Sequence, residues 1–317
     1  MPPPTTATVL HASDADEEGF LPEGPRAFEL DGRAALLWVN IQTALDATQG
    51  ELHVRYWDTG GTESWTLPGR PGFAIPTDRP GVVLVGMDHA VGTFDLESYE
   101  WLPLGRLPDP HPRELVNDAE VTPDGRAVVF GTKDTRFAEP LAGLYLLTLG
   151  DNRVSRLRGG QTCSNGKVFA GATLFDIDTP TRTVARYRLD ATARELTADG
   201  VALDLRGEPG FPDGMADAGD GTVVVAFYNP EPVAAGRAVR YDLRTGATLD
   251  EWATPGSPRV TCPCLVQRPD GVKLVLTTAT EGMPAELKAS CPTAGSLFVA
   301  DTRLEVVPAS PVVLLGG

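Results

Sequence analysis

Four oxygen-bearing side chains recur in this sequence at related positions: Glu23, Asn117, Asn165 and Asp213, the last three spaced 48 residues apart. If they met in a confined space, two carboxylates and two amides would repel one another and lose hydration without compensation. A divalent cation would compensate them, and an all-oxygen set suits a hard ion such as Ca²⁺, Mg²⁺ or Mn²⁺. Two negative charges would leave coordination positions for water or substrate, as in a catalytic metal site.

Each of these residues stands at the start of a predicted β-hairpin. A hairpin has a first strand, a tight turn and a second apolar strand, as in "NDAEVTPDGRAVVFGT". Pro212-Asp213-Gly214 is turn chemistry, yet a later turn, Gly219-Asp220-Gly221, already serves that hairpin. Asp213 therefore belongs to the start of the first strand. Six hairpins begin at residues 23, 72, 117, 165, 213 and 262, at intervals of 49, 45, 48, 48 and 49 residues.

A second pair of strands is predicted after each hairpin, for example in "GTFDLESYEWLPL", "AVRYDLRTGATLDEW" and, last, "SLFVADTRLEVVPA". Six units of four strands, with almost no helical periodicity, predict an all-β, six-bladed β-propeller. Its four-stranded antiparallel blades would surround a central channel, with residues 1–317 forming a single domain. The alternative is a β-sandwich, which would not need six matched hairpins. In a propeller the first strand of each blade lines the channel, so the four residues would meet at one mouth.

Plainer interpretations exist for three of these residues. Asn165-Gly166 is a common hairpin dipeptide, Asn117-Asp118 can cap a turn, and Pro212-Asp213-Gly214 can be a turn alone. Their shared position in the repeat favours a common site, because turn residues need not coincide in blade register.

Composition limits the partners and the compartment. The formal net charge of −16 argues against nucleic acid and an anionic membrane, because both need a basic surface. The N-terminal segment lacks the pattern of a signal peptide, and no run of about 18 apolar residues predicts a spanning helix. Four cysteines are too few for a disulfide framework, so we expect a reducing, cytoplasmic location. Cys262-Pro263-Cys264 is interpreted as buried packing, and the oligomeric state stays open.

The same stretches carry a family resemblance. "NDAEVTPDGRAVVFGT", "SNGKVF" with "LFDIDTPTRTVARYRLD", and "PDGMADAGDGTVVVAFYN" occur in family order within residues 21 to about 300. The chain resembles the regucalcin (senescence marker protein), gluconolactonase and luciferin-regenerating-enzyme family. The resemblance implies a small-molecule substrate and lactone hydrolysis in a six-bladed propeller with one divalent cation, Ca²⁺ first, with Mg²⁺, Mn²⁺ or Zn²⁺ as alternatives. It implies that Glu23, Asn165 and Asp213 bind the metal, that Asn117 is a further ligand or a substrate contact, and that Asp213 is the general base.

Two departures bear on the substrate. Sugar-lactone members often carry Arg two residues before the Asn-Asp pair, where this chain has Leu115, and often Gly after it, where this chain has Ala119. We therefore expect a less hydroxylated lactone. Lys133 and Arg136 could supply a displaced positive group for substrate binding, or could be solvated loop charges. Besides a metal-dependent lactonase, the sequence allows a non-catalytic metal- or ligand-binding propeller and a related propeller enzyme with different chemistry.

Overall fold

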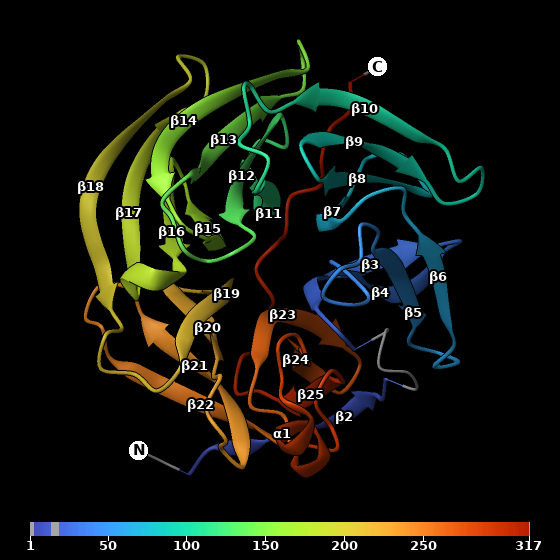
Figure 1. Ribbon diagram of the computed structural model, residues 1–317, viewed down its shortest axis with the longest axis vertical. Coiled ribbons are helices and arrows are strands. Elements are labelled where there is room, and N and C mark those ends of the chain that lie inside the picture. Colours follow the sequence, from blue (N-terminus) through green and yellow to red (C-terminus); the bar gives the residue numbers. More distant parts are fainter. Residues whose placement is uncertain (1–2, 14–18, 317) are drawn as a thin grey trace.

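The computed structural model describes residues 3–13 and 19–316, whose strands form six sheets arranged as blades around a central axis (Figure 1). Each sheet contains four antiparallel strands. Among the described residues, regular helix is limited to α1 (Ala285–Ser290) and one 3-10 turn at Thr179–Thr181. No described helix is long and apolar enough to cross a membrane. The predicted all-β, six-bladed propeller is confirmed.

Blades 1 to 4 are each built from four consecutive strands. Their bounds are, for blade 1, β3 (Pro22–Leu30), β4 (Arg33–Asn40), β5 (Glu51–Tyr56) and β6 (Thr62–Thr66); for blade 2, β7 (Pro71–Pro76), β8 (Val82–Met87), β9 (Ala90–Asp95) and β10 (Trp101–Arg106); for blade 3, β11 (Glu114–Val121), β12 (Ala127–Asp134), β13 (Ala142–Thr148) and β14 (Arg153–Gln161); and for blade 4, β15 (Ser164–Ala170), β16 (Thr173–Asp178), β17 (Thr183–Asp190) and β18 (Glu195–Asp204).

Blades 5 and 6 include strands from the N-terminal segment. Blade 5 contains β19 (Phe211–Gly219), β20 (Thr222–Tyr228), β21 (Ala235–Asp242) and β22 (Thr248–Pro255), with β1 (Thr5–Thr6) added in parallel at its edge. Blade 6 contains β23 (Val260–Arg268), β24 (Gly271–Thr278), β25 (Leu297–Asp301) and, outermost, β2 (Thr8–His11). Pairing of β2 with β25 closes the ring between the two ends of the chain.

The strand predicted in "LEVVPA" is therefore wrong. The outer edge of β25 is already occupied by β2. The segment beyond β25 also contains Pro308 and Pro311, which cannot donate backbone hydrogen bonds to a ladder. This C-terminal tail (residues 302–316) instead crosses the mouth of the channel at which the inner strands end (Figure 1).

The C-terminal tail is attached on both sides of the channel. Leu304 and Val307 pack on the core between blades 5 and 6. Val313 is fully buried in the core between blades 2 and 3 and pairs in parallel with Thr77. Between these anchors, residues 307–312 line a cavity of about 580 Å³ inside the channel. The tail therefore ties opposite sides of the ring together.

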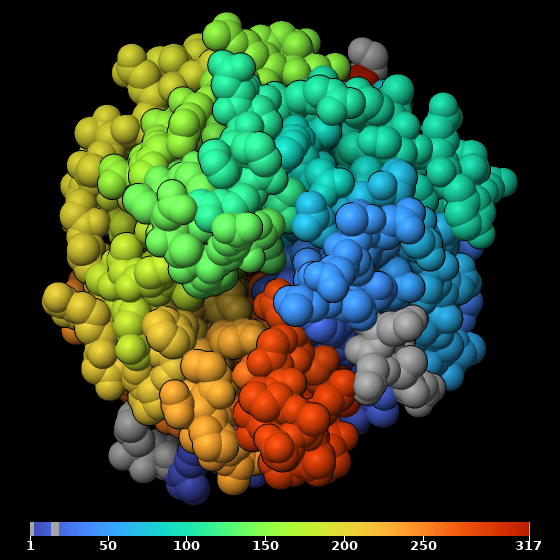
Figure 2. Space-filling view, in the orientation of Figure 1, coloured from blue at the N-terminus to red at the C-terminus, as the bar shows by residue number. Residues whose placement is uncertain are grey.

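The blades are held together by apolar residues that face their neighbours around the ring. Between blades 2 and 3, for example, Phe73, Val116 and Phe130 lie in one buried cluster. A Cβ atom added at Gly86 would lie 2.2 Å from Phe73 and 2.6 Å from Val116, so only glycine allows this approach of the two sheets. Figure 2 shows neighbouring blades packed directly against one another.

Every inner strand loses its pairing register at the same level of the channel. The breaks lie between Glu23 and Arg26, Pro71 and Phe73, Val116 and Ala119, Ser164 and Lys167, Pro212 and Met215, and Val260 and Pro263. Each break contains or adjoins one of the six repeat positions found in the sequence. A bulge bends its strand and redirects side chains. The repeated local irregularity thus turns residues of several blades toward the channel.

Candidate functional site

Glu23, Asn117, Asn165 and Asp213 lie on the inner strands β3, β11, β15 and β19 of four different blades. Their exposed fractions are only 9%, 5%, 5% and 7%. Asn117, Asn165 and Asp213 fall inside the register breaks of their strands, and Glu23 adjoins its own. Because a bulge redirects the side chains of its strand, the four breaks give these polar groups a common local geometry.

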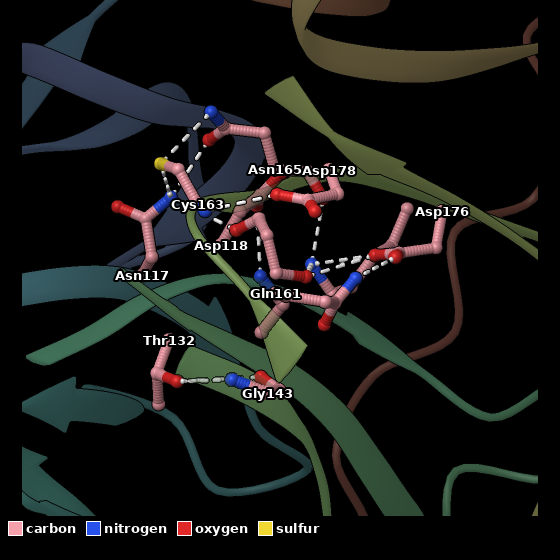
Figure 3. A network of polar contacts seen from close by, with 12 residues as sticks. Asn117, Asp118, Thr132, Gly143, Gln161, Cys163, Asn165, Asp176 and Asp178 are labelled. Atoms are coloured by element: carbon pink, nitrogen blue, oxygen red, sulfur yellow. Dashed lines mark hydrogen bonds and ion pairs between the residues drawn. The ribbon is translucent and has the colours of Figure 1, made fainter. Parts of the chain in front are cut away.

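The two amides are joined directly across blades 3 and 4 (Figure 3). Asn117 Nδ2 donates to Asn165 Oδ1 at 2.7 Å and to the carbonyl oxygen of Ser164 at 3.0 Å. Asn165 Nδ2 donates to Thr179 Oγ1 at 2.7 Å, and Thr179 donates onward to the carbonyl oxygen of Pro212. Because both amide nitrogens are engaged by the protein, the amide oxygens are the atoms with lone pairs left for a cation.

Burial and neighbouring negative charge disfavour the ionised form of both carboxylates. Burial, together with the charge of Asp118, raises the pKa of Glu23 to about 8. Burial also raises the pKa of Asp213 well above its usual range, and the charge of Glu23 adds to that rise. The charge of Lys133 acts in the opposite direction on both groups. A further positive charge near Glu23 and Asp213 would favour their ionised forms.

This donor set fits a hard divalent cation. It supplies two carboxylates and two oriented amide oxygens, which are preferred ligands of Ca²⁺ and also suit Mg²⁺ or Mn²⁺. Nowhere in residues 3–13 and 19–316 do three or more His, Cys, Asp or Glu side chains form a metal-binding group. The candidate site therefore depends on its amides as much as on its carboxylates.

Lys133 and Leu115 lie beside each other at the edge of this site. They are direct partners in the pairing of β11 with β12, and Lys133 also forms an isolated bridge with Cys163 of blade 4. Lys133 is half-buried, and its charge affects Glu23 and Asp213. Leu115 is 2% exposed. Arg136 is exposed in the loop after β12, where its backbone N–H donates to Asp134.

Several neighbours of the site were not singled out from the sequence. Cys163 Sγ accepts from Asn165 Nδ2 at 3.4 Å, and Thr179 links Asn165 to β19. Glu281, between β24 and α1, contributes negative charge to Glu23 and Asp213. In the sequence, Cys163 lies just before Asn165 in "TCSNG", and Thr179 lies after it in "DIDTPT". Nearness to Asn165 in these stretches was the only sequence evidence for either residue. Glu281 has no comparable signal, because its proximity arises from ring closure.

The cysteines predicted to be packing residues are buried. Cys262 and Cys264 are 6% and 8% exposed free thiols on β23. Cys264 belongs to an apolar cluster with Trp38 and Val275. Burial raises the pKa of both thiols, to about 11 for Cys264, which disfavours the reactive thiolate.

Comparison with known proteins shows where the chain belongs. The family model described as "SMP-30/Gluconolactonase/LRE-like region" matches residues 21–280. The protein belongs to the SMP-30/gluconolactonase/LRE-like family. It is 30% identical to the L-arabinolactonase of Azospirillum brasilense over 95% of this chain and 93% of that one. It is 26% identical to a putative sugar lactone lactonase of Bacillus subtilis over 96% of this chain and 98% of that one.

Solved structures of this family share the fold. A calcium-binding regucalcin from Agrobacterium tumefaciens matches with a TM-score of 0.81 and 23% identity, covering 98% of each chain. A luciferin-regenerating enzyme matches with a TM-score of 0.80 and 18% identity, covering 98% of this chain and 100% of that one. These matches establish the same propeller architecture along nearly the whole chain.

Proposed function

We propose that this protein is a metal-dependent lactonase whose site is formed by Glu23, Asn117, Asn165 and Asp213. The observation that carries the proposal is the placement of four buried polar residues at equivalent register breaks of four inner strands. Two of them are carboxylates with raised pKa values, and two are amides whose nitrogens donate within the protein. Relatives named as lactonases, which cover nearly the whole chain, support lactone hydrolysis as the reaction.

Glu23, Asn165 and Asp213 would hold the cation, with Asn117 as a further ligand or as a contact to the substrate. When bound, the cation would polarise the lactone carbonyl and stabilise the negative charge that develops on its oxygen. The relative described as calcium-binding makes Ca²⁺ the first candidate.

Asp213 would act as the general base. It would help to hold the cation and would accept a proton from the attacking water. The water oxygen forms a bond to the carbonyl carbon, and the ring C–O bond then breaks. The ring oxygen leaves with a proton returned from Asp213, so the product is a hydroxy acid.

Lys133 and Leu115 would contact the substrate beyond the carbonyl group. The Lys133 ammonium, close enough to influence Glu23 and Asp213, can donate to an oxygen of the substrate. Leu115 offers no hydrogen bond where a sugar hydroxyl would need one, which favours a less hydroxylated lactone. Arg136 is a weaker candidate contact, because it is exposed in the neighbouring loop.

The second candidate function is a non-catalytic propeller that binds a divalent cation or a small ligand, and Leu115 is the observation that favours it. We also propose a reducing, cytoplasmic compartment, which fits the four free thiols of the described residues.

A lactone hydrolysis assay separates the two functions. We expect turnover of at least one lactone in a panel from gluconolactone to unsubstituted γ- and δ-lactones, loss of turnover with chelator, and recovery with Ca²⁺ or Mn²⁺. Asp213→Asn should lower kcat at least about 100-fold. Asp217→Asn, an exposed carboxylate on the same strand, is the matched control. Cation binding without turnover of any lactone would support the non-catalytic function instead.

A further inference from the structure

A buried ion pair lies directly behind the proposed ligand Asn165. Lys167 Nζ is 3.3 Å from Asp176 Oδ1, and the side chains are 0% and 1% exposed. The two residues are opposite each other in the pairing of β15 with β16. Every polar end of the pair is engaged. Lys167 also donates to Ser164 Oγ, and Asp176 accepts from the Ser164 hydroxyl. Asp176 also accepts from Gln161 at 2.7 Å (Figure 3).

Such a pair is a weak source of fold stability. Removing two charges from water costs several kcal/mol per ion, and apolar replacements of similar volume are often neutral or stabilising. Apolar side chains of the same two strands, such as Val168 and Leu174, are buried without this cost. What distinguishes the pair is therefore the atoms to which it is hydrogen-bonded.

Lys167 binds the main chain of the residue proposed to hold the metal. The register of β15 against β16 passes from Ser164–Asp178 to Lys167–Asp176, so Asn165 has no partner across the ladder. Lys167 Nζ donates to the carbonyl oxygen of Asn165 at 2.6 Å. The bulge leaves the Asn165 carbonyl oxygen without a partner in the sheet, and Lys167 supplies its hydrogen bond. Without that donor, the buried carbonyl would destabilise the fold.

The same contacts reach Asn117 on the neighbouring blade. Asn117 Nδ2 donates to the carbonyl oxygen of Ser164, whose hydroxyl lies between Lys167 and Asp176. A Cβ atom at Gly131 would lie 2.3 Å from Ser164 Oγ and 2.8 Å from Lys167 Nζ, so blade 3 approaches the pair closely. The ion pair therefore contacts Ser164 and Asn165, the two residues to which the Asn117 and Asn165 amides are attached or hydrogen-bonded.

We propose that Lys167, held by Asp176, is a positioning residue that sets the bulge at Ser164–Asn165 and thereby the direction of the Asn117 and Asn165 amides. The inference rests on the proposed metal site. It places the main effect of the ion pair on cation affinity and, through Asn165, on catalysis.

The test is a charge-free double variant, Lys167→Met with Asp176→Leu, compared with wild type by calorimetric titration of Ca²⁺ and Mn²⁺ and by urea denaturation. Outer contacts of metal ligands typically contribute about 10- to 100-fold to affinity, so we expect a loss of at least about tenfold. The midpoint of unfolding in the metal-free state should fall, because the Asn165 carbonyl loses its donor and Gln161 loses its acceptor, so affinities are compared only under conditions in which both proteins are folded. The matched control is Arg240→Met with Asp250→Leu, which removes a cross-strand ion pair of 2.9 Å in blade 5. It should leave the cation affinity unchanged.

Each outcome bears on a defined claim. Wild-type affinity in the Lys167/Asp176 variant, or an equal loss in the blade 5 control, would overturn the positioning role. If wild type itself binds neither cation, the proposed metal site fails first. Should the apolar variant not fold, Lys167→Gln with Asp176→Asn removes both charges but keeps polar side chains, and its shorter amide cannot reach the Asn165 carbonyl. The same loss of affinity is expected there, and an unchanged affinity would overturn the role.

Discussion

Ionisation of Glu23 should destabilise the metal-free protein as the pH rises. Burial raises the pKa of Glu23 from 4.5 to about 8. Between these values the folded state keeps a proton that the unfolded state releases, so stability falls with rising pH. The contribution is therefore fully favourable below about pH 4.5 and is lost progressively up to about pH 8.

The size of this effect follows from the two pKa values. A difference between 4.5 and about 8 corresponds to about 5 kcal/mol in the free energy of unfolding. Typical domains have about 5–15 kcal/mol in total, so the loss would be large. A cation bound between Glu23 and Asp213 favours the ionised carboxylates, and excess Ca²⁺ should therefore flatten the dependence on pH.

The assay is urea denaturation at about pH 5.5, 6.5 and 7.5, with a chelator and with excess Ca²⁺. Glu23→Gln should remove the share of the dependence on pH that comes from Glu23, and Asp213→Asn in the same protein should remove the share that comes from Asp213. Glu29→Gln is the control, because Glu29 is an exposed carboxylate on the same strand. Equal slopes for wild type and Glu23→Gln would mean that Glu23 is already ionised in the metal-free fold and would refute the electrostatic argument.

Three further outcomes are expected. Asp213→Ala should weaken Ca²⁺ binding more than Asn117→Ala, since it removes a charge as well as an oxygen, and equal titration curves for Asp213→Ala and wild type would exclude Asp213 as a ligand. Leu115→Arg should shift the ratio of kcat/KM toward gluconolactone over an unsubstituted lactone, and an unchanged ratio in a folded, metal-binding variant would show that Leu115 does not determine specificity. Val313→Asp should lower the free energy of unfolding by at least about 2 kcal/mol, because Val313 anchors the C-terminal tail fully buried in the core between blades 2 and 3. Val306→Asp, at a site of the same tail that is 72% exposed, should cost little, and equal costs would contradict the anchoring of the tail.

The repeat made the propeller and the grouping of its inner-strand residues predictable. Asp213 was informative because its Pro-Asp-Gly stretch was not needed as a hairpin turn. The structure gives a physical reason for the shared register, since each repeat position lies at a bulge that redirects side chains. Because each inner strand has a bulge at the same place, the redirected residues recur at the same position of each sequence repeat.

Contacts between blades could not be predicted in the same way. Residues 302–316 contain many strand-forming apolar side chains, but the outer partner of β25 is β2, a strand almost 300 residues away in the chain. Lys167 gives no signal in the repeat, because its role depends on the close approach of Gly131 from blade 3. The fold thus follows from local periodicity, whereas the surroundings of the candidate site depend on long-range packing.

The most direct test of the proposed site is an anomalous difference map from crystals of this protein soaked in Mn²⁺. The account predicts one strong peak in the channel, within about 2.5 Å of carboxylate or amide oxygens of Glu23, Asn165 and Asp213. A peak bound elsewhere, or none at a concentration that saturates the protein in solution, would contradict it.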